Sequence, residues 1–530
     1  MSAPTDRIET GGNVLYADVL VIGGSLAGAW AALSARSAGA RVVLAEKGFV
    51  GTAGVVAAAN CGGQHTIPDD PVTSDKVVHS RHEAALGLDD LEYARRVYDV
   101  TWVVGQKLAE RGFVSSRGPG PAGRRLASFR GPYSLHFLRQ ELVKAGVVIL
   151  DHSPALELLS RDGIVSGAQG TNRQTGEDWA VHAGAVILAT GGNAFRSGAM
   201  GTNGLTGEGH LMAVEAGAKL AGMEFSGHYG IVPLNSATTK GFWYSSATFW
   251  DGNGKELARN GWESVPDVAQ AILDTGRVWA QMNRGPENFE AGARQASPNM
   301  FLYFDRLGID PVTQRFPVDL IYEGTVRATG GLVVDRDAHT GVPGLWAAGD
   351  VTERLRLTGA SMSGAGPAIS WCLASGEWAG EAAAGFAKER GKLVGSAKAL
   401  GLAGIRSAKG RSPQVTSRFF ARVAQEEIIP IGKNAFRTLP GIASSLAVLD
   451  QSWSDLRDGL QPTGARERVA AREAAALVQG ARWIYRAAQV RTETRGLHRL
   501  REFPQQDPSQ LDRIELSGID GIAVTRVGCG

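Results

Sequence analysis

A short segment near the start of the chain carries residue types that could bind the phosphates of a dinucleotide. Residues 19–22 form an uninterrupted apolar run, which is typical of a parallel strand buried on both faces. Gly23 follows at once and permits a tight turn, and Gly28 allows the next helix to pack closely on the strand. Ser25 occupies the position where the backbone must approach the phosphates; its side chain narrows that approach, but its hydroxyl could face a phosphate. Together with the partial positive charge of the helix N-terminus, the segment predicts a pyrophosphate site.

The second half of a dinucleotide-binding signature follows at the expected distance. Residues 41–46 read as the next strand of a βαβ unit, and this strand ends in Glu46, 18 residues after Gly28. A carboxylate here would accept hydrogen bonds from an adenosine ribose and disfavours a 2′-phosphate, which would require an arginine. The alternative, a glycine turn and a surface glutamate in an unrelated α/β protein, requires both halves to coincide by chance.

Length, charge and cysteine content restrict the class of protein. A chain of 530 residues predicts two or three packed units with a large core. The 55 basic and 53 acidic side chains leave a net charge of +2 without a long basic tract, so we expect no nucleic-acid partner. Cys61, Cys372 and Cys529 form no CxxC pair, which excludes an iron–sulfur cluster or structural zinc built by this chain alone. We therefore expect no metal site, and any cluster would belong to another subunit.

The sequence contains no segment that we expect to enter a membrane. It has no run of about 18 apolar residues, and residues 1–13 contain acids and glycines where a signal peptide needs a basic and then an apolar stretch. These features predict a soluble, cytoplasmic protein. The chain contains 70 glycines, nearly twice the average share of about 7%. Because they follow no repeat, they suggest a backbone that wraps closely around a large ligand.

Three further blocks extend the expected ligand site. Residues 51–63 are mostly small and would allow close contact with an extended, flat ligand. Residues 185–192 read as another buried strand that ends in a small polar turn. Residues 341–350 place Asp350 at a strand end, where it could bind a ribityl hydroxyl, and residues 361–369 open a helix whose free N–H groups could face the pyrimidine edge of a flavin.

Taken in order, these blocks resemble those of the FAD-binding flavoproteins in the succinate dehydrogenase and fumarate reductase superfamily. That superfamily includes L-aspartate oxidase, 3-ketosteroid dehydrogenases and the α subunit of adenylylsulfate reductase. The matching sequences are VIGGSLAG, AEKG with GTAGVVAAA, VILATGG, TNGLTGEG with AVEAGAKLAGMEF, GGLVVD with VPGLWAAGD, and RTETRGLHRLREFP. Each block alone is only moderately specific, but the resemblance spans nearly the whole chain and six blocks in this order leave little room for coincidence.

The resemblance implies an α/β fold built from a Rossmann-like FAD-binding domain of the GR2 type, an α+β capping domain over the substrate, and a C-terminal helical domain. The expected ranges are 15–231 for the first part of the FAD-binding domain, 232–324 for the capping domain, 325–392 for the second part of the FAD-binding domain, and 393–530 for the helical domain. Residues 418–429 and 470–485 show the apolar periodicity of helices within the last range.

The resemblance also implies a set of residues that bind FAD. They are Gly23, Ser25, Leu26, Ala27, Gly28, Glu46, Lys47, Thr52, Ala53, Gly54, Ala59, Asn60, Gly62, Ala155, Ala189, Thr190, Gly191, Glu208, Gly349, Asp350, Ser363, Gly364, Gly366, Ala368 and Ile369. Some relatives attach FAD covalently to a histidine, but residues 51–59 contain none. We therefore expect non-covalent FAD and interpret the nearby His65 as a loop residue.

The chain departs from its relatives at the residues that act on dicarboxylates. By the resemblance, Gln270 stands where those relatives have a proton-delivering arginine, and Met362 stands where they have an arginine that binds a carboxylate. Residues 326–331 replace a segment that begins with a histidine in those relatives. Because glutamine cannot cycle a proton, fumarate, succinate and aspartate are not expected substrates.

Three polar residues remain near the expected substrate site. The resemblance aligns Tyr229 with an active-site histidine and places His228 beside it. Either side chain could act as an acid or base, a histidine more readily because the ordinary pKa of imidazole lies near neutrality. Arg327 could anchor an anion. The alternatives are that the first two residues only pack, and that Arg327 pairs with a nearby acid such as Glu323 or Asp335.

Five residues near the C-terminus match a superfamily motif that ties the helical domain to the rest of the chain. We interpret them as structural ion-pairing residues rather than catalytic ones: Arg491, Glu493, Arg495, His498 and Arg499.

An intact FAD framework with altered dicarboxylate positions predicts an FAD-dependent dehydrogenase or reductase. It would move hydride between flavin N5 and a carbon of a small organic substrate, activated by a carbonyl group. One alternative is an oxidase that acts on an amine or a C–C bond and returns electrons to O₂. Another is a flavoprotein subunit that passes electrons to a protein partner carrying iron–sulfur clusters.

Overall fold

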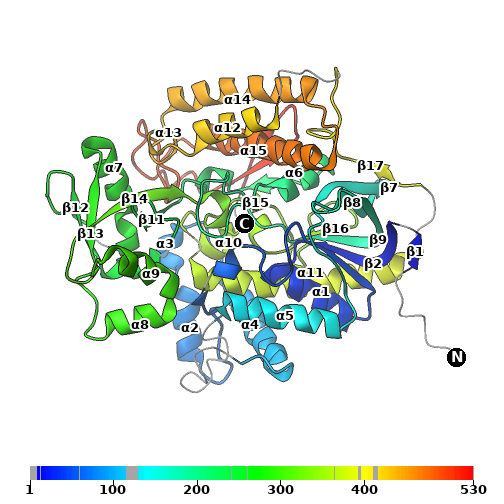
Figure 1. Ribbon diagram of the computed structural model, residues 1–530, viewed down its shortest axis with the longest axis horizontal. Coiled ribbons are helices and arrows are strands. Elements are labelled where there is room, and N and C mark those ends of the chain that lie inside the picture. The colour runs from blue at the N-terminus through cyan, green and yellow to red at the C-terminus, as the bar shows by residue number, and fades with distance from the viewer. Residues whose placement is uncertain are drawn as a thin grey trace.

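The computed structural model describes most of the chain. The described ranges are 9–11, 13–58, 60–114, 129–239, 241–259, 261–362, 364–391, 396–409 and 416–528. Two residues that we expect to bind the cofactor, Ala59 and Ser363, lie outside these ranges. Figure 1 shows a central sheet with its helices on the right, a smaller region of strands and helices on the left, and C-terminal helices along the top.

The parallel strands at the centre of the largest sheet follow the spatial order β6-β3-β2-β9-β16. Their bounds are β2 (Val14–Ile22), β3 (Val42–Ala45), β6 (Val148–Leu150), β9 (Asp178–Leu188) and β16 (Leu345–Ala347). Every residue of β3 and β16 is buried, as expected for apolar strands covered on both faces. The predicted α/β class with a Rossmann-like sheet is confirmed.

Antiparallel strands extend this sheet beyond β9. The first half of β9 pairs with β8, which in turn pairs with β7. The strands added there are β7 (Ala155–Arg161), β8 (Ile164–Thr171) and β17 (Lys398–Ala399), whereas β1 (Glu9–Gly11) pairs with the start of β2. A separate two-stranded sheet joins β4 (Asn60–Cys61) to β5 (Phe129–Arg130).

Two helices from distant parts of the sequence pack on each other and on the central strands. These are α1 (Leu26–Ser37) and α11 (Ala365–Arg390). A Cβ atom on Gly380 of α11 would lie 2.5 Å from the carbonyl oxygen of Ala31, so glycine permits the close contact between the helices. The remaining helices of this region are α2 (Pro71–His79), α3 (His82–Ala85), α4 (Leu91–Glu110), α5 (Gly131–Lys144), α6 (Glu208–Glu215) and α10 (Leu355–Thr358).

The region on the left of Figure 1, which we call the cap, is built on an antiparallel sheet with the order β11-β14-β13-β12. Its strands are β11 (Tyr229–Pro233), β12 (Thr248–Asp251), β13 (Val278–Gln281) and β14 (Phe316–Tyr322). Its helices are α7 (Val265–Thr275), α8 (Phe289–Ala296) and α9 (Pro298–Leu307). Tyr244, Phe249, Phe304 and Phe316 are buried in its core, so these aromatic residues stabilise the cap itself.

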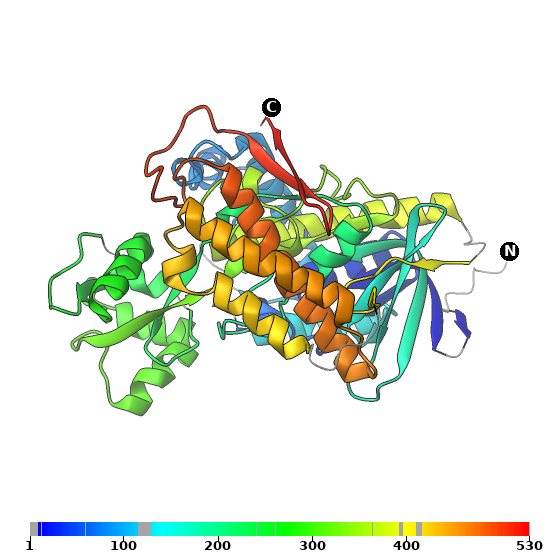
Figure 2. The same ribbon diagram turned by 90° about the horizontal axis from the view of Figure 1, so that it is seen from above.

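The C-terminal region combines helices with a hairpin. The helices are α12 (Ser417–Ile428), α13 (Ile431–Asn434), α14 (Leu439–Gly459) and α15 (Ala465–Val490). Both helices expected from apolar periodicity are confirmed, as α12 and α15. Figure 2 shows α12, α14 and α15 side by side above the rest of the molecule. The hairpin, β18 (Arg513–Ser517) and β19 (Ala523–Val527), forms a sheet with β10 (Leu220–Ala221) and β15 (Gly331–Leu332).

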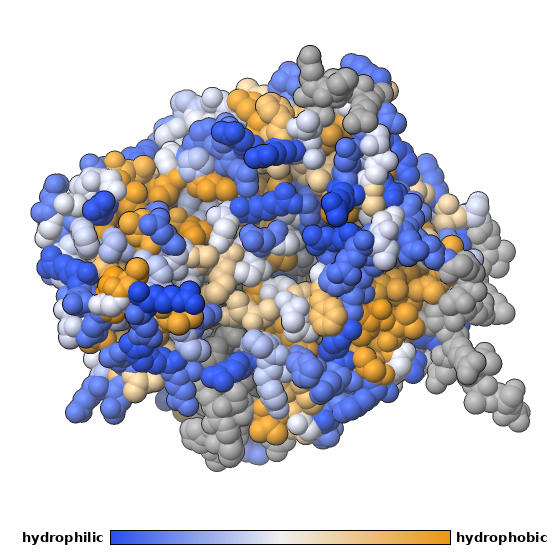
Figure 3. All heavy atoms as spheres, viewed as in Figure 1, coloured by the Kyte–Doolittle hydropathy of each residue, from blue (hydrophilic) through white to orange (hydrophobic). Residues whose placement is uncertain are grey.

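The surface is mixed in character. Figure 3 shows hydrophobic residues in separate patches over the cap and at the lower right, with hydrophilic residues between them. Among the described residues, no helix has the length and apolarity needed to cross a bilayer.

Candidate functional site

A cavity of about 220 Å³ opens at the carboxyl ends of the parallel strands. Ile22 at the end of β2 and Ala45 at the end of β3 both line it. Ala189 and Ala348, which directly follow β9 and β16, line it as well. Open parallel sheets place their ligands at this edge, because the turns that leave the strands meet there.

The glycine turn after β2 forms one wall of the cavity. Gly23 adopts a φ of 105°, and a Cβ there would lie 2.3 Å from the carbonyl oxygen of Ala189. A Cβ on Gly28 would lie 1.8 Å from the carbonyl oxygen of Gly23, so glycine allows α1 to lie close to the strand. Ser25, Leu26 and Ala27 line the cavity at the N-terminus of α1, where the first N–H groups have no acceptor within the helix.

The side chain of Glu46 binds the backbone of the glycine turn. Its Oε2 accepts a hydrogen bond of 2.6 Å from the N–H of Gly24, and its Oε1 accepts one of 2.7 Å from the N–H of Gly48. The side chain is buried and lines the cavity. Because a carboxylate offers about four acceptor positions, two backbone donors leave capacity for ligand hydroxyls.

A buried ion cluster connects the cavity wall to the C-terminal helices. Lys47 Nζ lies 2.6 Å from Glu208 Oε1 and 2.5 Å from Glu473 Oε1. Burial acts to lower the pKa of Lys47, but the two carboxylates outweigh it and hold that pKa above its ordinary value. Lys47 and Glu208 line the cavity, whereas Glu473 belongs to α15, so the cluster ties that helix to the ligand site.

Asp350 lines the opposite part of the cavity and is held by a buried arginine. The guanidinium of Arg354 binds the Asp350 carboxylate. The same guanidinium donates to the carbonyl oxygens of Thr325 and Val326, at 3.1 and 3.2 Å, and to that of Ala328. Arg354 therefore fixes the turn η5 (Gly324–Val326) relative to the cavity.

Most of the residues expected to bind the cofactor meet at this cavity. Those that line it are Gly23, Ser25, Leu26, Ala27, Glu46, Lys47, Ala53, Gly54, Ala155, Ala189, Thr190, Gly191, Glu208 and Asp350. Sequence reasoning missed other lining residues, among them Arg173 and Cys372. No motif pointed to Arg173, which donates a hydrogen bond of 3.3 Å to the carbonyl oxygen of Lys47.

Other described residues of that set do not line the cavity: Gly28, Thr52, Gly62, Gly349, Gly364, Gly366, Ala368 and Ile369. The side chain of Asn60 lies outside the described part of the structure. Gly28 and Gly349 support its wall, since a Cβ on Gly349 would lie 2.7 Å from the Cβ of Ala27. The helix that residues 361–369 are expected to open is present as α11. The start of this helix, however, is packed against side chains from other elements. A Cβ on Gly364 would lie 2.0 Å from Arg81 Nη2, and one on Gly366 would lie 3.1 Å from Gln64 Cγ.

His228, Glu323 and Arg327 form a second polar cluster where the cap joins the central region. His228 Nε2 lies 3.2 Å from Glu323 Oε2, and Arg327 Nε lies 3.6 Å from Glu323 Oε1. Thr239 donates a hydrogen bond of 2.9 Å to Glu323 Oε1. Burial acts to raise the pKa of Glu323, but the hydrogen bond from His228 and the charge of Arg327 hold it below its ordinary value. The alternative that Arg327 pairs with Glu323 is therefore realised.

This cluster lies beside the cavity wall. A Cβ on Gly324 would lie 2.1 Å from the carbonyl oxygen of Asn193, and the N–H of Asn193 donates 2.8 Å to Thr325 Oγ1. Val326 packs with Leu205, which lines the cavity. Arg327 follows Val326 directly, so one member of the polar cluster is adjacent in sequence to the residue that packs with Leu205.

Tyr229 lies away from the cavity, contrary to its expected place in the site. Its hydroxyl donates a hydrogen bond of 2.9 Å to the carbonyl oxygen of Ile429, and its ring lies 5.2 Å from that of Tyr322. Burial raises the pKa of Tyr229 well above its ordinary value. Neighbouring residues of a strand point to opposite faces, so Tyr229 packs in the core beneath the C-terminal helices while His228 meets Glu323.

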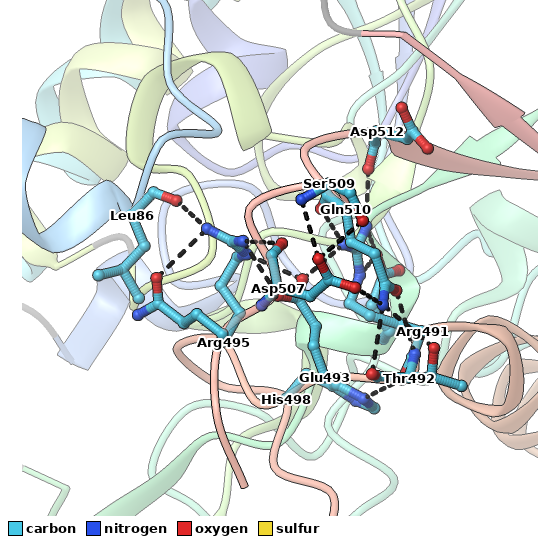
Figure 4. Close-up of polar contacts among 12 residues, drawn as sticks. Leu86, Arg491, Thr492, Glu493, Arg495, His498, Asp507, Ser509, Gln510 and Asp512 are labelled. Atoms are coloured by element: carbon cyan, nitrogen blue, oxygen red, sulfur yellow. Dashed lines mark hydrogen bonds and ion pairs between the residues drawn. The ribbon is translucent and has the colours of Figure 1, made fainter. Parts of the chain in front are cut away.

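The C-terminal motif is a buried network, drawn in Figure 4. Arg491 lies 2.9 Å from Glu224 and 3.0 Å from Glu493, which also lies 2.8 Å from Arg495. Burial and the surrounding arginines lower the pKa of His498 well below its ordinary value. Because Arg437 Nη1 donates 2.8 Å to its Nδ1, the ring proton lies on Nε2, which donates 2.9 Å to the carbonyl oxygen of Arg491. These residues have the structural role expected of them, but Arg499 has no such ion pair among the described residues.

The two positions that depart from the dicarboxylate pattern lie outside the polar cluster. Gln270 is on α7 and donates a hydrogen bond of 2.7 Å to Asp274. Met362 is partly buried just before α11. Neither takes part in the contacts among His228, Glu323 and Arg327.

The sequence is similar to a known family and to several curated proteins. The family described as FAD binding domain matches residues 18–111 and 104–370. The L-aspartate oxidase of Streptomyces coelicolor is 26% identical over 543 residues, which cover 95% of this chain and 91% of that protein. An uncharacterized FAD-dependent oxidoreductase of Methanocaldococcus jannaschii is 25% identical over 545 residues, which cover 94% of this chain and 96% of that protein.

Solved structures share the fold over the whole chain. The quinol fumarate reductase of E. coli superposes with a TM-score of 0.79 at 21% identity, covering 98% of this chain and 97% of that one. The adenylylsulfate reductase of Archaeoglobus fulgidus superposes with a TM-score of 0.73 at 18% identity, covering 100% and 99%.

Proposed function

We propose that this chain, which belongs to the FAD binding domain family and is an FAD-dependent oxidoreductase, acts as a dehydrogenase or reductase on an organic substrate activated by a carbonyl group. The substrate would lie against His228, Glu323 and Arg327. The observation that carries the proposal is the buried ion-paired cluster of these three residues beside the cavity wall.

The residues around the cavity fit FAD. The glycine turn and the N-terminus of α1 would hold the pyrophosphate, and Glu46 would accept hydrogen bonds from the adenosine ribose. Thr190 Oγ1 is buried at the cavity without a hydrogen-bond partner among the described residues, as expected of a group that awaits a ligand. We propose that FAD is held non-covalently, because residues 51–58 contain no histidine.

FAD supplies a two-electron, one-hydride step at its N5 atom. The protein must supply the accompanying proton, and we assign this role to His228. Its Nε2 lies 3.2 Å from the Glu323 carboxylate, which orients the ring, so Nδ1 is the nitrogen that would meet the substrate. In the direction of reduction His228 would deliver a proton to the substrate carbon next to the carbonyl group; in the direction of oxidation it would remove that proton.

Arg327 would polarise the carbonyl oxygen. Its guanidinium is only about one-quarter exposed, and its Nε lies 3.6 Å from Glu323 Oε1, so the charge is held at the cluster. A guanidinium next to a developing negative charge stabilises it more strongly in a partly dehydrated site than in water.

A simple C4 dicarboxylate is not the substrate that we propose. Such a substrate needs a cation for each carboxylate, and Gln270 and Met362 supply none. One second candidate rests on a specific observation: curated relatives of near full-length coverage are named L-aspartate oxidases. An oxidase that acts on an amine and reacts with O₂ is therefore the alternative to test beside it.

The experiment is a substrate screen read from the flavin itself. Saturated ketones, acids with a carbonyl group, and amino acids are each mixed with the oxidised protein without oxygen, and the flavin absorbance near 450 nm is followed. Bleaching by a carbonyl compound, slowed about 100-fold or more in His228→Asn with FAD content unchanged, is the expected result. Bleaching by amino acids alone would overturn the proposal in favour of the amine oxidase.

A further inference from the structure

Arg499 lies among arginines at the junction of the C-terminal segment with the cap. Its backbone carbonyl oxygen accepts a hydrogen bond of 2.9 Å from the N–H of Arg437. Its guanidinium, in contrast, forms no hydrogen bond or ion pair with any of the residues that the structure describes, although the side chain is only partly exposed. Its neighbours in the motif, Arg491 and Arg495, are fully paired.

Positive charge around Arg499 exceeds the negative charge available to balance it. The charges of Arg259 and Arg437 act on it, and the acid whose charge opposes theirs is Asp267. Asp267 is already committed, since its two carboxylate oxygens lie 2.6 and 2.8 Å from the guanidinium of Arg259. Burial, together with the charges of Arg259 and Arg437, lowers the pKa of Arg499 to about 10, so it remains charged at neutral pH.

Arg437 contributes a buried donor without a partner in the part of the chain that the structure describes. This residue is fully buried; its Nε donates to Asn434 and its Nη1 to the carbonyl oxygen of Glu224, at 2.9 and 2.6 Å. Its Nη2 has no partner among the described residues. A buried guanidinium with an unmet N–H group costs free energy unless a ligand or water meets it.

The arginines lie next to the proposed substrate site. A Cβ on Gly227, the residue before His228, would lie 2.5 Å from the carbonyl oxygen of Leu497 and 3.6 Å from Arg437 Nη2. On the cap side, Asp267 lies in the first turn of α7, and Gln270 on the same helix accepts a hydrogen bond of 3.3 Å from Arg501. The C-terminal segment therefore bridges His228 and the cap helix.

We propose that Arg499 binds an oxyanion on the substrate, so that the substrate carries a carboxylate, sulfonate or phosphate group on the side away from the reacting carbonyl. This inference rests on the proposed function, because it takes the region beside His228 as the substrate site. A guanidinium fork matches the two oxygens of such a group, and the excess positive charge around it disfavours a neutral or cationic group.

Sulfate is the probe, titrated into the FAD-loaded protein by calorimetry at constant ionic strength set with sodium chloride. We expect saturable binding, weakened at least 10-fold in Arg499→Gln. The matched control is Arg422→Gln on the exposed face of α12, where the arginine pairs only with Glu426 at 2.7 Å; it removes the same charge and leaves sulfate affinity unchanged. Arg499→Lys keeps the charge but lacks the planar guanidinium group, so its sulfate affinity should lie between those of the parent protein and Arg499→Gln.

A second measurement needs no variant and applies if Arg499→Gln fails to fold. Phenylglyoxal labels accessible guanidinium groups, and peptide mapping reports each arginine separately. Sulfate should slow the labelling of Arg499 at least fivefold and leave that of Arg422 unchanged. Equal labelling with and without sulfate, equal affinity of the parent and Arg499→Gln, or no saturable binding by a parent that retains FAD would each overturn the anion site. None of these results depends on the activity of His228, so the anion site at Arg499 and the proposed function can be overturned independently.

Discussion

His228 Nε2 and Glu323 Oε2 lie 3.2 Å apart where the chain enters and leaves the cap. His228 immediately precedes β11, and Glu323 immediately follows β14, the strand that pairs with β11. The contact thus spans 95 residues of sequence, and the carboxylate is fixed on its other oxygen by Thr239 and faced there by Arg327. Gly230 leaves room for it, since a Cβ there would lie 2.8 Å from Glu323 Oε2.

The first prediction separates His228 from its neighbour Tyr229. His228→Asn should lower the rate of substrate-dependent flavin bleaching about 100-fold or more, because the proton at the substrate carbon loses its carrier. Tyr229→Phe should keep the rate within about twofold and cost about 1 kcal/mol of unfolding free energy, since it removes the hydroxyl that donates to Ile429. Stopped-flow absorbance and urea unfolding measure the two effects. A large rate loss in Tyr229→Phe with normal His228→Asn kinetics would reverse the assignment.

Gly28→Ala should abolish FAD retention. The added Cβ would lie 1.8 Å from the carbonyl oxygen of Gly23, so α1 must move away from the turn, at a cost of about 3 kcal/mol. Gly385→Ala is the matched control within a helix, because no atom lies within 4 Å of its Cβ position. It should stabilise the protein by about 0.5–1 kcal/mol and keep the flavin. The ratio of flavin to protein absorbance after gel filtration measures FAD retention in both variants. Retained FAD in Gly28→Ala would contradict the requirement for close contact between α1 and the turn.

Lys47→Met should destabilise the protein by about 3 kcal/mol, because it leaves the Glu208 carboxylate without its cation, while Glu473 keeps only its ion pair with Arg196. Lys144→Met removes an exposed lysine that lies 2.7 Å from Glu141, and should cost at most about 1 kcal/mol. Urea unfolding followed by tryptophan fluorescence compares the pair. Similar losses in the two variants would show that the cluster around Lys47 contributes no more than a surface ion pair.

Stability should fall as the pH falls from 6.5 to 4, partly through His210. Burial lowers the pKa of His210 to about 4 from an ordinary value of 6.5. Between these values the unfolded chain binds a proton that the folded chain does not, so this histidine contributes a slope of about 1.4 kcal/mol per pH unit. His210→Gln should reduce the slope by that amount, whereas His136→Gln, at an exposed position on α5, should not. An unchanged slope in His210→Gln would contradict the buried, neutral imidazole.

The meeting of the glycine turn and Glu46 at one cavity could be predicted because its signals are local. Gly23, Gly28 and Glu46 lie within one βαβ unit, and turn chemistry together with strand length fixes their relation in space. The substrate end depends on contacts between distant segments. Nothing in the sequence near Lys47 indicates that it meets Glu473 in α15, and nothing near His228 selects Glu323 as its partner.

Two differences from the sequence predictions have identifiable physical reasons. The sequence offers both Tyr229 and His228 as acid or base, with the histidine favoured, but adjacent residues at the start of a strand face opposite sides, and only a structure shows which side faces the cluster. The hairpin of β18 and β19 was not predicted, because it is short and completes a sheet whose other strands, β10 and β15, contribute two residues each.

The most direct test of the account is to photoreduce the bound FAD without oxygen and mix it, in separate experiments, with air-saturated buffer and with a panel of α,β-unsaturated carbonyl compounds that carry a carboxylate. We predict that at least one carbonyl acceptor reoxidises the flavin faster than air does, and that His228→Asn slows only the reaction with that acceptor. Reoxidation by air within seconds, with peroxide formed and no acceptor faster, would contradict the account and identify an oxidase. Slow reoxidation by air and by every acceptor would also contradict it and direct the search to an electron-transfer protein.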